Sequence, residues 1–172
     1  MMVPVGEATI ATWSGALVTL AGFVCFATTA CAGPSGIPAD GVPVSMQRLF
    51  SDQDSGIEQS RRAVIRSAAQ WQSTWDELTR ARTLAVPQRP LDFGRSMVIL
   101  ATMGTQRTGG HSIAIEGVYR GGGRLWVVVR EVKPGLGCMT TQALTAPADA
   151  ISVPLSDEPV SFVERTETRN CG

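Results

Sequence analysis

Short segments that are rich in β-branched residues, or that alternate apolar with polar residues, recur along most of this chain. Clusters of Gly, Pro, Ser and Asp separate them, for example in the polar stretch 51–56. Such segments bounded by turn residues are typical of β-strands. We therefore predict strands at residues 44–50, 61–66, 97–103, 111–119, 125–132, 150–155 and 160–164.

One segment has a helical period instead. Trp71, Trp75 and Leu78 recur at positions i, i+4 and i+7, which places them on one face of a helix. Ser67 precedes this stripe and Gln70 follows it by the spacing of a capping box, so the helix is predicted to begin just after Ser67. Two Trp on one helix face are typical of a core position.

Many short strands and one helix predict an α+β fold: a mostly antiparallel β-sheet or sandwich, with the Trp-bearing helix covering a face or an end. A length of 172 residues suits one such domain, which we place at residues 44–172. Residues 31–43 are rich in Pro, Gly and Ala and are predicted to form a flexible tether. Residues 1–30 are predicted to be a signal peptide.

The export prediction depends on an uncharged apolar run at residues 16–30, which has the length of a signal peptide. The run ends in small residues before Cys31, and this junction resembles a bacterial lipobox in which the cysteine is acylated. We expect an envelope lipoprotein anchored to the membrane through Cys31. Cleavage after Ala32, giving a periplasmic or extracellular soluble protein, and a retained membrane anchor are the alternatives.

Two cysteines, Cys138 and Cys171, remain in the predicted domain. Because exported proteins fold in an oxidising compartment, we predict a disulfide between them. Two buried free thiols or a metal pair are the alternatives, and the metal pair is disfavoured because the chain has one His. The 15 Lys and Arg balance 15 Asp and Glu, so no basic face for nucleic acid is indicated.

The candidate functional segment connects two of the predicted strands. It contains a Gly pair, which permits another segment to approach the backbone closely. Neighbouring residues such as Arg107 can donate hydrogen bonds to a partner. His111 adds a ring whose charge would appear near pH 6 to 7 if its pKa is unperturbed. A purely structural, Gly-rich connection is the competing interpretation. The predicted partner-binding loop consists of Gln106, Arg107, Thr108, Gly109, Gly110 and His111.

Catalytic signals are weak throughout the chain. His111 and Ser112 are adjacent, and neighbouring residues on a strand point to opposite faces, so they do not form an obvious base and nucleophile. Neither a nucleophile elbow, nor a zinc-protease motif, nor a calcium loop is present. We predict no enzymatic activity, no metal and no cofactor.

Three sequence pieces, in this order, resemble the PrcB C-terminal domain family. They are a Trp-bearing helix followed by Asp92-Phe93, an apolar strand closing on residues 104–112, and a Pro-Gly turn before residues 138–147. The resemblance covers roughly residues 57–155. The family is named after a subunit of a bacterial surface protease complex.

The resemblance implies a non-enzymatic, exported protein-binding module. It would be an accessory subunit whose partner is another exported protein, such as a protease or its complex. The alternative is a protease inhibitor of the chagasin type, which acts through a Gly-containing loop. Residues 108–111 distantly resemble the loop that such inhibitors insert into an active site.

Overall fold

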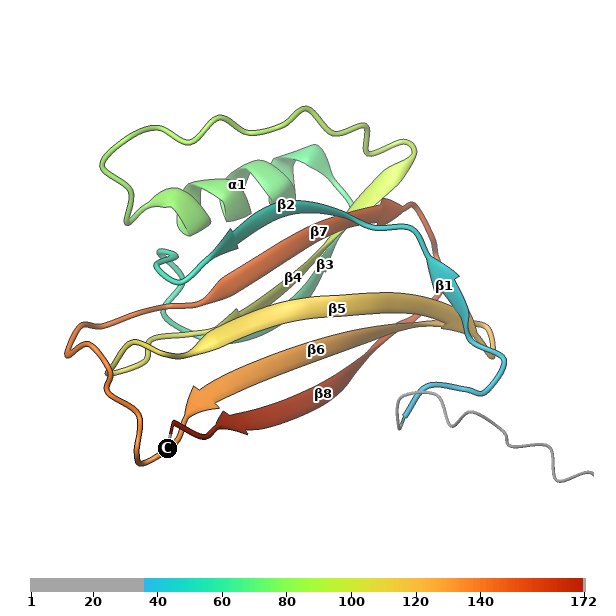
Figure 1. Cartoon of the computed structure of the whole chain (residues 1–172). Coiled ribbons are helices and arrows are strands. Elements are labelled where there is room, and N and C mark those ends of the chain that lie inside the picture. Colours follow the sequence, from blue (N-terminus) through green and yellow to red (C-terminus); the bar gives the residue numbers. More distant parts are fainter. Residues whose placement is uncertain (1–35, 172) are drawn as a thin grey trace, which may run out of the picture. The chain divides into compact units, whose positions relative to one another are not determined.

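The computed structural model describes residues 36–171, which form two four-stranded β-sheets and one helix (Figure 1). The first sheet, sheet A, has the strand order β1 (Val42–Val44), β5 (Ser112–Gly121), β6 (Arg124–Pro134) and β8 (Val160–Arg169). The second, sheet B, has the order β2 (Gln47–Asp52), β7 (Ala148–Pro154), β4 (Ser96–Met103) and β3 (Ser60–Ile65). All pairs are antiparallel except β6 with β8, so the predicted α+β sandwich is confirmed.

Sheet B is buried on both faces, and β4 shows why. Met97, Ile99 and neighbours on the same face pack against sheet A, in a cluster that includes Ile115 and Val127. Val98 and Leu100 point the other way, into a second cluster under the helix. Because side chains alternate between faces, a strand between two apolar layers reads as an unbroken apolar run. The domain therefore has three layers: sheet A, sheet B and helix.

Helix α1 (Ala68–Thr79) covers the outer face of sheet B (Figure 1). The Ser67 hydroxyl accepts the Gln70 backbone N–H at 3.3 Å, so the predicted N-cap is confirmed. Trp71 and Trp75 are 3% and 6% exposed and pack edge to face at 5.4 Å, which confirms their assignment to the core. In the described part of the chain, no helix is long and apolar enough to cross a bilayer.

Two predictions at the start of the domain were wrong. The strand predicted at 44–50 is two strands, because β1 ends at Val44 in sheet A and β2 begins at Gln47 in sheet B. Val44, Ser45, Met46 and Gln47 alternate apolar with polar residues as they would along one strand, so the pattern does not reveal the change of sheet. The tether predicted at 31–43 ends too late, since Val42 and Pro43 already pair with β5. Residues 1–35, with the predicted signal peptide and the predicted acylation site Cys31, lie outside the described residues.

An arginine and a buried aspartate join the sheets along one edge of the sandwich. Asp149 of β7 is 0% exposed and accepts the Ile115 N–H of β5 at 2.7 Å. Arg48 of β2 donates to both carboxylate oxygens, at 2.9 and 3.1 Å, and to the Ile115 carbonyl at 3.0 Å. Burial raises the pKa of Asp149, while the Ile115 N–H and Arg48 act in the opposite direction.

A second arginine joins the sheets along the opposite edge. Arg62 of β3 donates to Glu164 of β8 at 2.8 Å and to Glu131 of β6 at 2.7 Å. It also donates to the Thr102 carbonyl at 2.7 Å. Both open sides of the sandwich are therefore closed by side-chain hydrogen bonds that fix one sheet over the other.

Candidate partner-binding end of the domain

Three connections lie at one end of the sandwich, at the left of Figure 1: residues 53–59, 104–111 and 135–147. We call this part of the domain the loop end. Gln106 and Thr145 exchange backbone hydrogen bonds of 2.7 and 3.0 Å. Ala146 donates to the Gln53 carbonyl at 2.7 Å, and Ser55 donates back to Ala146 at 3.0 Å. Residues 145–146 therefore tie the other two connections together.

Most of the predicted binding loop is engaged with its own chain. The Gln106 amide nitrogen donates to the carbonyls of Met103 and Gly104, at 3.2 and 3.4 Å. The Thr108 carbonyl accepts the Thr145 hydroxyl at 3.0 Å. These contacts hold the loop in place and leave Gln106 and Thr108 half-buried.

The Gly pair lies beneath residues 138–147. Gly109 is buried, and its N–H donates to the Thr141 carbonyl at 3.0 Å. A Cβ at Gly109 would lie 2.3 Å from the Thr141 hydroxyl oxygen. Gly110 has φ +84°, and a Cβ there would lie 3.3 Å from both Pro134 and Thr140. The close backbone approach that the sequence predicts is made to this chain's own residues.

Arg107 and His111 differ in the solvent exposure of their side chains. Arg107 is exposed, whereas His111 is half-buried with an Nδ1 atom that is buried and has no hydrogen-bond partner. Desolvation lowers the pKa of His111, and the nearby Lys133 charge lowers it further. The charge that an unperturbed pKa places near pH 6 to 7 is therefore displaced to lower pH, and the ring is neutral at pH 7.

A disulfide anchors the connection 135–147. Cys138 is bonded to Cys171, with the two Cα atoms 4.9 Å apart, so the predicted pairing is confirmed over free thiols or a metal pair. Cys171 follows β8, and Gly135 also donates its N–H to the Arg169 carbonyl at 2.9 Å. The connection is thus fastened to sheet A at its start and to sheet B at its end.

This anchored connection presents large apolar side chains to solvent. Leu136, Met139 and Leu144 have relative exposures of 111%, 101% and 71%. Single exposed apolar residues are ordinary, but several on one segment are typical of an interaction site. The sequence analysis missed these residues. The available signal was a set of apolar residues without strand or helix period, placed between a Pro-Gly turn and Pro147.

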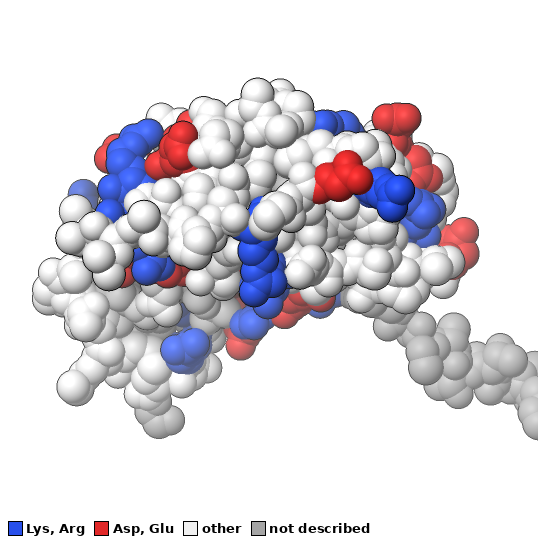
Figure 2. All heavy atoms as spheres, turned by 90° about the horizontal axis from the view of Figure 1, so that it is seen from above, with Lys and Arg blue, Asp and Glu red and all other residues white. Residues whose placement is uncertain are grey.

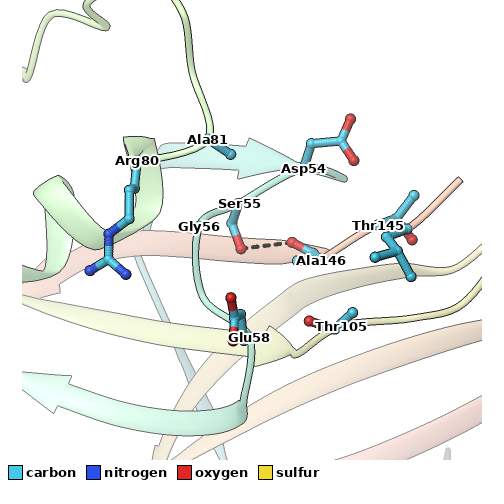
Figure 3. A pocket seen from close by; sticks show the side chains of 10 residues that line it. Asp54, Ser55, Gly56, Glu58, Arg80, Ala81, Thr105, Thr145 and Ala146 are labelled. Atoms are coloured by element: carbon cyan, nitrogen blue, oxygen red, sulfur yellow. Dashed lines mark hydrogen bonds between the residues drawn. The ribbon is translucent and has the colours of Figure 1, made fainter.

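A hollow of about 310 Å³ opens beside Leu144 (Figure 3). Its walls come from the end of α1 at Arg80, from the connection 53–59 and from Thr105 and Thr145. The Ser55 hydroxyl donates to the Ala146 carbonyl at 2.7 Å. The hollow has the volume of a small binding recess, with carboxylates, a guanidinium and apolar atoms around it.

The charge distribution does not single out one type of ligand. Figure 2 shows the α1 side of the domain, where positive and negative side chains are interspersed. Among residues 36–171, no three His, Cys, Asp or Glu side chains gather where they could hold a metal ion. The most distinctive surface feature of the described chain is therefore apolar.

These features define an α+β sandwich domain with one covering helix and an anchored loop end. The family model described as PrcB C-terminal matches residues 97–154, from the second residue of β4 to the last of β7. The match confirms the resemblance predicted from the sequence over about a third of the chain. It contains the Gly-pair loop and the Cys138 segment, whereas the Trp-bearing helix lies before it. No curated protein and no solved structure gives a significant match.

Proposed function

We propose that this protein is a non-enzymatic, exported protein-binding module, an accessory subunit of a surface protease complex, and that the loop end is its binding surface. The resemblance to the PrcB C-terminal family over residues 97–154 supports the protein class. The matched segment includes the exposed loop-end side chains, which supports the placement of the surface.

The observation that carries the proposal is the presentation of Leu136, Met139 and Leu144 on a segment that is already immobilised. The disulfide and the backbone bonds from residues 106 and 109 fix this segment before any partner arrives. Binding through a pre-ordered surface loses less conformational entropy. Interfaces place apolar side chains at their centre and polar ones such as Arg107 at their rim.

The expected partner is another exported protein, a protease or its complex. Acylation at Cys31 would hold the domain at the membrane and leave the loop end free to reach that partner. The hollow beside Leu144 would receive a side chain from the partner. Nucleic acid is not an expected ligand, since the net charge is zero and charges of both signs are mixed on the face that Figure 2 shows.

The inhibitor alternative needs the loop 108–111 to enter an active site. Gly109 instead lies against Thr141, and the Gly110 Cβ position faces Pro134 and Thr140. The observed geometry therefore favours docking through the exposed apolar segment over insertion of the Gly pair. Inhibition of a papain-like protease by the purified chain, lost in an Arg107→Ala variant, would favour the alternative.

The experiment is chemical cross-linking of the full chain in its native envelope, followed by capture and mass spectrometry. The double variant Leu136→Ser and Met139→Ser should capture the partner at least about tenfold more weakly, roughly 1.4 kcal/mol. Its free energy of unfolding should change by no more than about 0.5 kcal/mol, because both residues are exposed.

The matched control is Leu84→Ser. Leu84 is 82% exposed, but it lies in the connection that follows α1. This control should capture the partner as the parental chain does. Equal capture by the loop-end double variant, or loss confined to the Leu84 variant, would contradict the proposed surface.

A further inference from the structure

Strand β8 forms an edge of sheet A that differs from the other three sheet edges. Edge strands present unpaired N–H and C=O groups and usually carry devices that block a further strand. β1 has three residues, one of them Pro43, and β2 carries a register shift between Arg48 and Phe50. β3 is shorter than β8, with six residues, and its Arg62 is drawn across to Glu164 of β8.

β8 has ten residues, contains no proline, and pairs with β6 without a register shift from Val160 to Arg169. Among the described residues, no strand pairs with its other edge. This edge lies along the bottom of sheet A in Figure 1. A long, regular open edge can accept one more strand through backbone hydrogen bonds.

The side chains of β8 are complementary to those of β8 itself. If two copies pair antiparallel with Thr166 opposite Thr166, Arg165 of each copy lies opposite Glu167 of the other. Arg165 and Glu167 share one face of the strand. In that register Glu164 lies opposite Thr168, which avoids a like-charge pair.

Neighbouring registers on the same face are unfavourable. Sliding one strand by two residues places Arg165 opposite Arg165 in one direction, and Glu167 opposite Glu167 in the other. Like charges directly opposite each other destabilise a strand pair. Within the chain, Arg165 lies 3.6 Å from Glu116 and Glu167 lies 3.4 Å from Arg130. The Arg165 and Glu167 side chains are still 38% and 59% exposed, so each can also face a charge on a second copy.

We propose that two copies of this chain associate through antiparallel pairing of β8, centred on Thr166. The pairing joins the two A sheets into one continuous eight-stranded sheet. The contact is isologous, since the same surface is used by both copies, and it closes at a dimer. The occupant of the edge is thus a second copy of the chain. This inference does not depend on the function proposed for the loop end.

The first test is site-specific oxidation of the full-length chain, purified in mild detergent. Directly opposed residues of an antiparallel pair have Cα atoms about 4.5–5.5 Å apart, within reach of a disulfide. Thr166→Cys should therefore give a covalent dimer on mild oxidation. Thr168→Cys is the matched control, because two such positions would lie about 14 Å apart along the paired strands.

The parental chain gives the baseline for its native cysteines. Rapid cross-linking of Thr166→Cys alone supports the proposal. Equal cross-linking of both variants, or none above the baseline, overturns it.

The second test is charge reversal, read by sedimentation over a concentration series. Arg165→Glu and Glu167→Arg should each weaken dimerisation at least about tenfold, since each creates like-charge pairs across the contact. The double variant should return the dissociation constant to within about threefold of the parental value, because the opposite-charge pairs are restored. Thermal melting checks that the single variants fold.

A parental chain that remains monomeric at the highest concentration overturns self-pairing, and so does a double variant as weak as the single ones. The edge would then be open to a strand of a different protein.

Discussion

The chain contains two Gly-Gly connections between strands that look alike in sequence and differ in the structure. Gly122 and Gly123 both have positive φ, +62° and +69°, and a Cβ at either would meet nothing within 4 Å. Gly109 has no such backbone requirement, but its Cβ would lie 2.3 Å from the Thr141 hydroxyl. The first pair serves a tight hairpin turn, and the second allows another segment to pack onto it.

A Gly pair in a sequence therefore indicates a structural constraint, but it does not indicate whether that constraint is backbone conformation or close packing. The hairpin pair is required by backbone conformation alone. In the loop-end pair Gly110 also has a positive φ of +84°, but Gly109 is required by the packing of Thr141, which lies on a distant segment that the disulfide holds in place. Only the second pair couples a surface that could bind a partner to the stability of the domain.

The largest expected effect is removal of the disulfide that holds the covering segment. Replacing Cys138 and Cys171 together by Ser should lower the free energy of unfolding by roughly 3–4 kcal/mol on the chain-entropy model. Denaturant unfolding measures this loss. Amide exchange should accelerate more at Gly109, which donates to Thr141, than at Leu125 beside the hairpin, which donates to Pro159.

Equal acceleration at both amides would show that the disulfide stabilises the whole domain rather than the loop end. An unchanged unfolding free energy would contradict the prediction outright.

A smaller effect separates the two Gly pairs directly. Gly109→Ala should destabilise the domain by about 1–3 kcal/mol, because the added methyl overlaps the Thr141 hydroxyl. Adding Thr141→Ala should recover most of this loss, since the next Thr141 atom, its Cβ, lies 3.6 Å away. Gly122→Ala should cost about 1 kcal/mol through its left-handed backbone.

No single change near Gly122 should rescue Gly122→Ala, since nothing lies within 4 Å of its Cβ position. A double-mutant cycle on unfolding free energies gives the Gly109–Thr141 coupling. Absence of coupling would show that the covering segment moves aside easily.

The smallest expected effect is the pH dependence from His111, at the end of the loop-end Gly pair. Burial and Lys133 lower its folded pKa below the usual value of 6.5. The unfolded chain therefore binds this proton more readily than the folded chain does. The contribution of His111 to stability is fully present above pH 6.5 and is lost as pH falls through the lowered folded pKa.

Thermal melts of the parental chain and of His111→Gln between pH 8 and pH 5 test this expectation. The difference in melting temperature should change in favour of the Gln variant as the solution is acidified. A constant difference across the range would contradict it.

The sequence predicted the class of fold well because that class follows from local patterns. The helix can be predicted from neighbouring residues alone, namely the apolar stripe at Trp71, Trp75 and Leu78 and the cap at Ser67. The change of sheet between Val44 and Gln47 could not be predicted, because the alternation of apolar and polar residues at positions 44–47 is the same on one strand or two.

The candidate site was less predictable than the fold. Arg107 is presented to solvent as a binding residue should be, while the burial of Gly109 depends on Thr141, which is distant in the sequence. Leu136, Met139 and Leu144 are exposed because the connection that carries them packs neither between the two sheets nor under the helix. Apolar residues normally indicate a core, so exposure of this kind cannot be inferred from residue type.

The place of β7 within sheet B sets an order for folding. β7 lies between β2 and β4, and β2 has no other strand partner in the described chain. The contact from Ser152 to Gln47 spans 105 residues. The first strand of sheet B must therefore wait, unpaired, until nearly the whole domain has emerged from the ribosome. Such long-range pairing slows folding and leaves the backbone groups of β2, with Leu49 and Phe50, without a partner in the meantime, which makes a holding chaperone useful during synthesis.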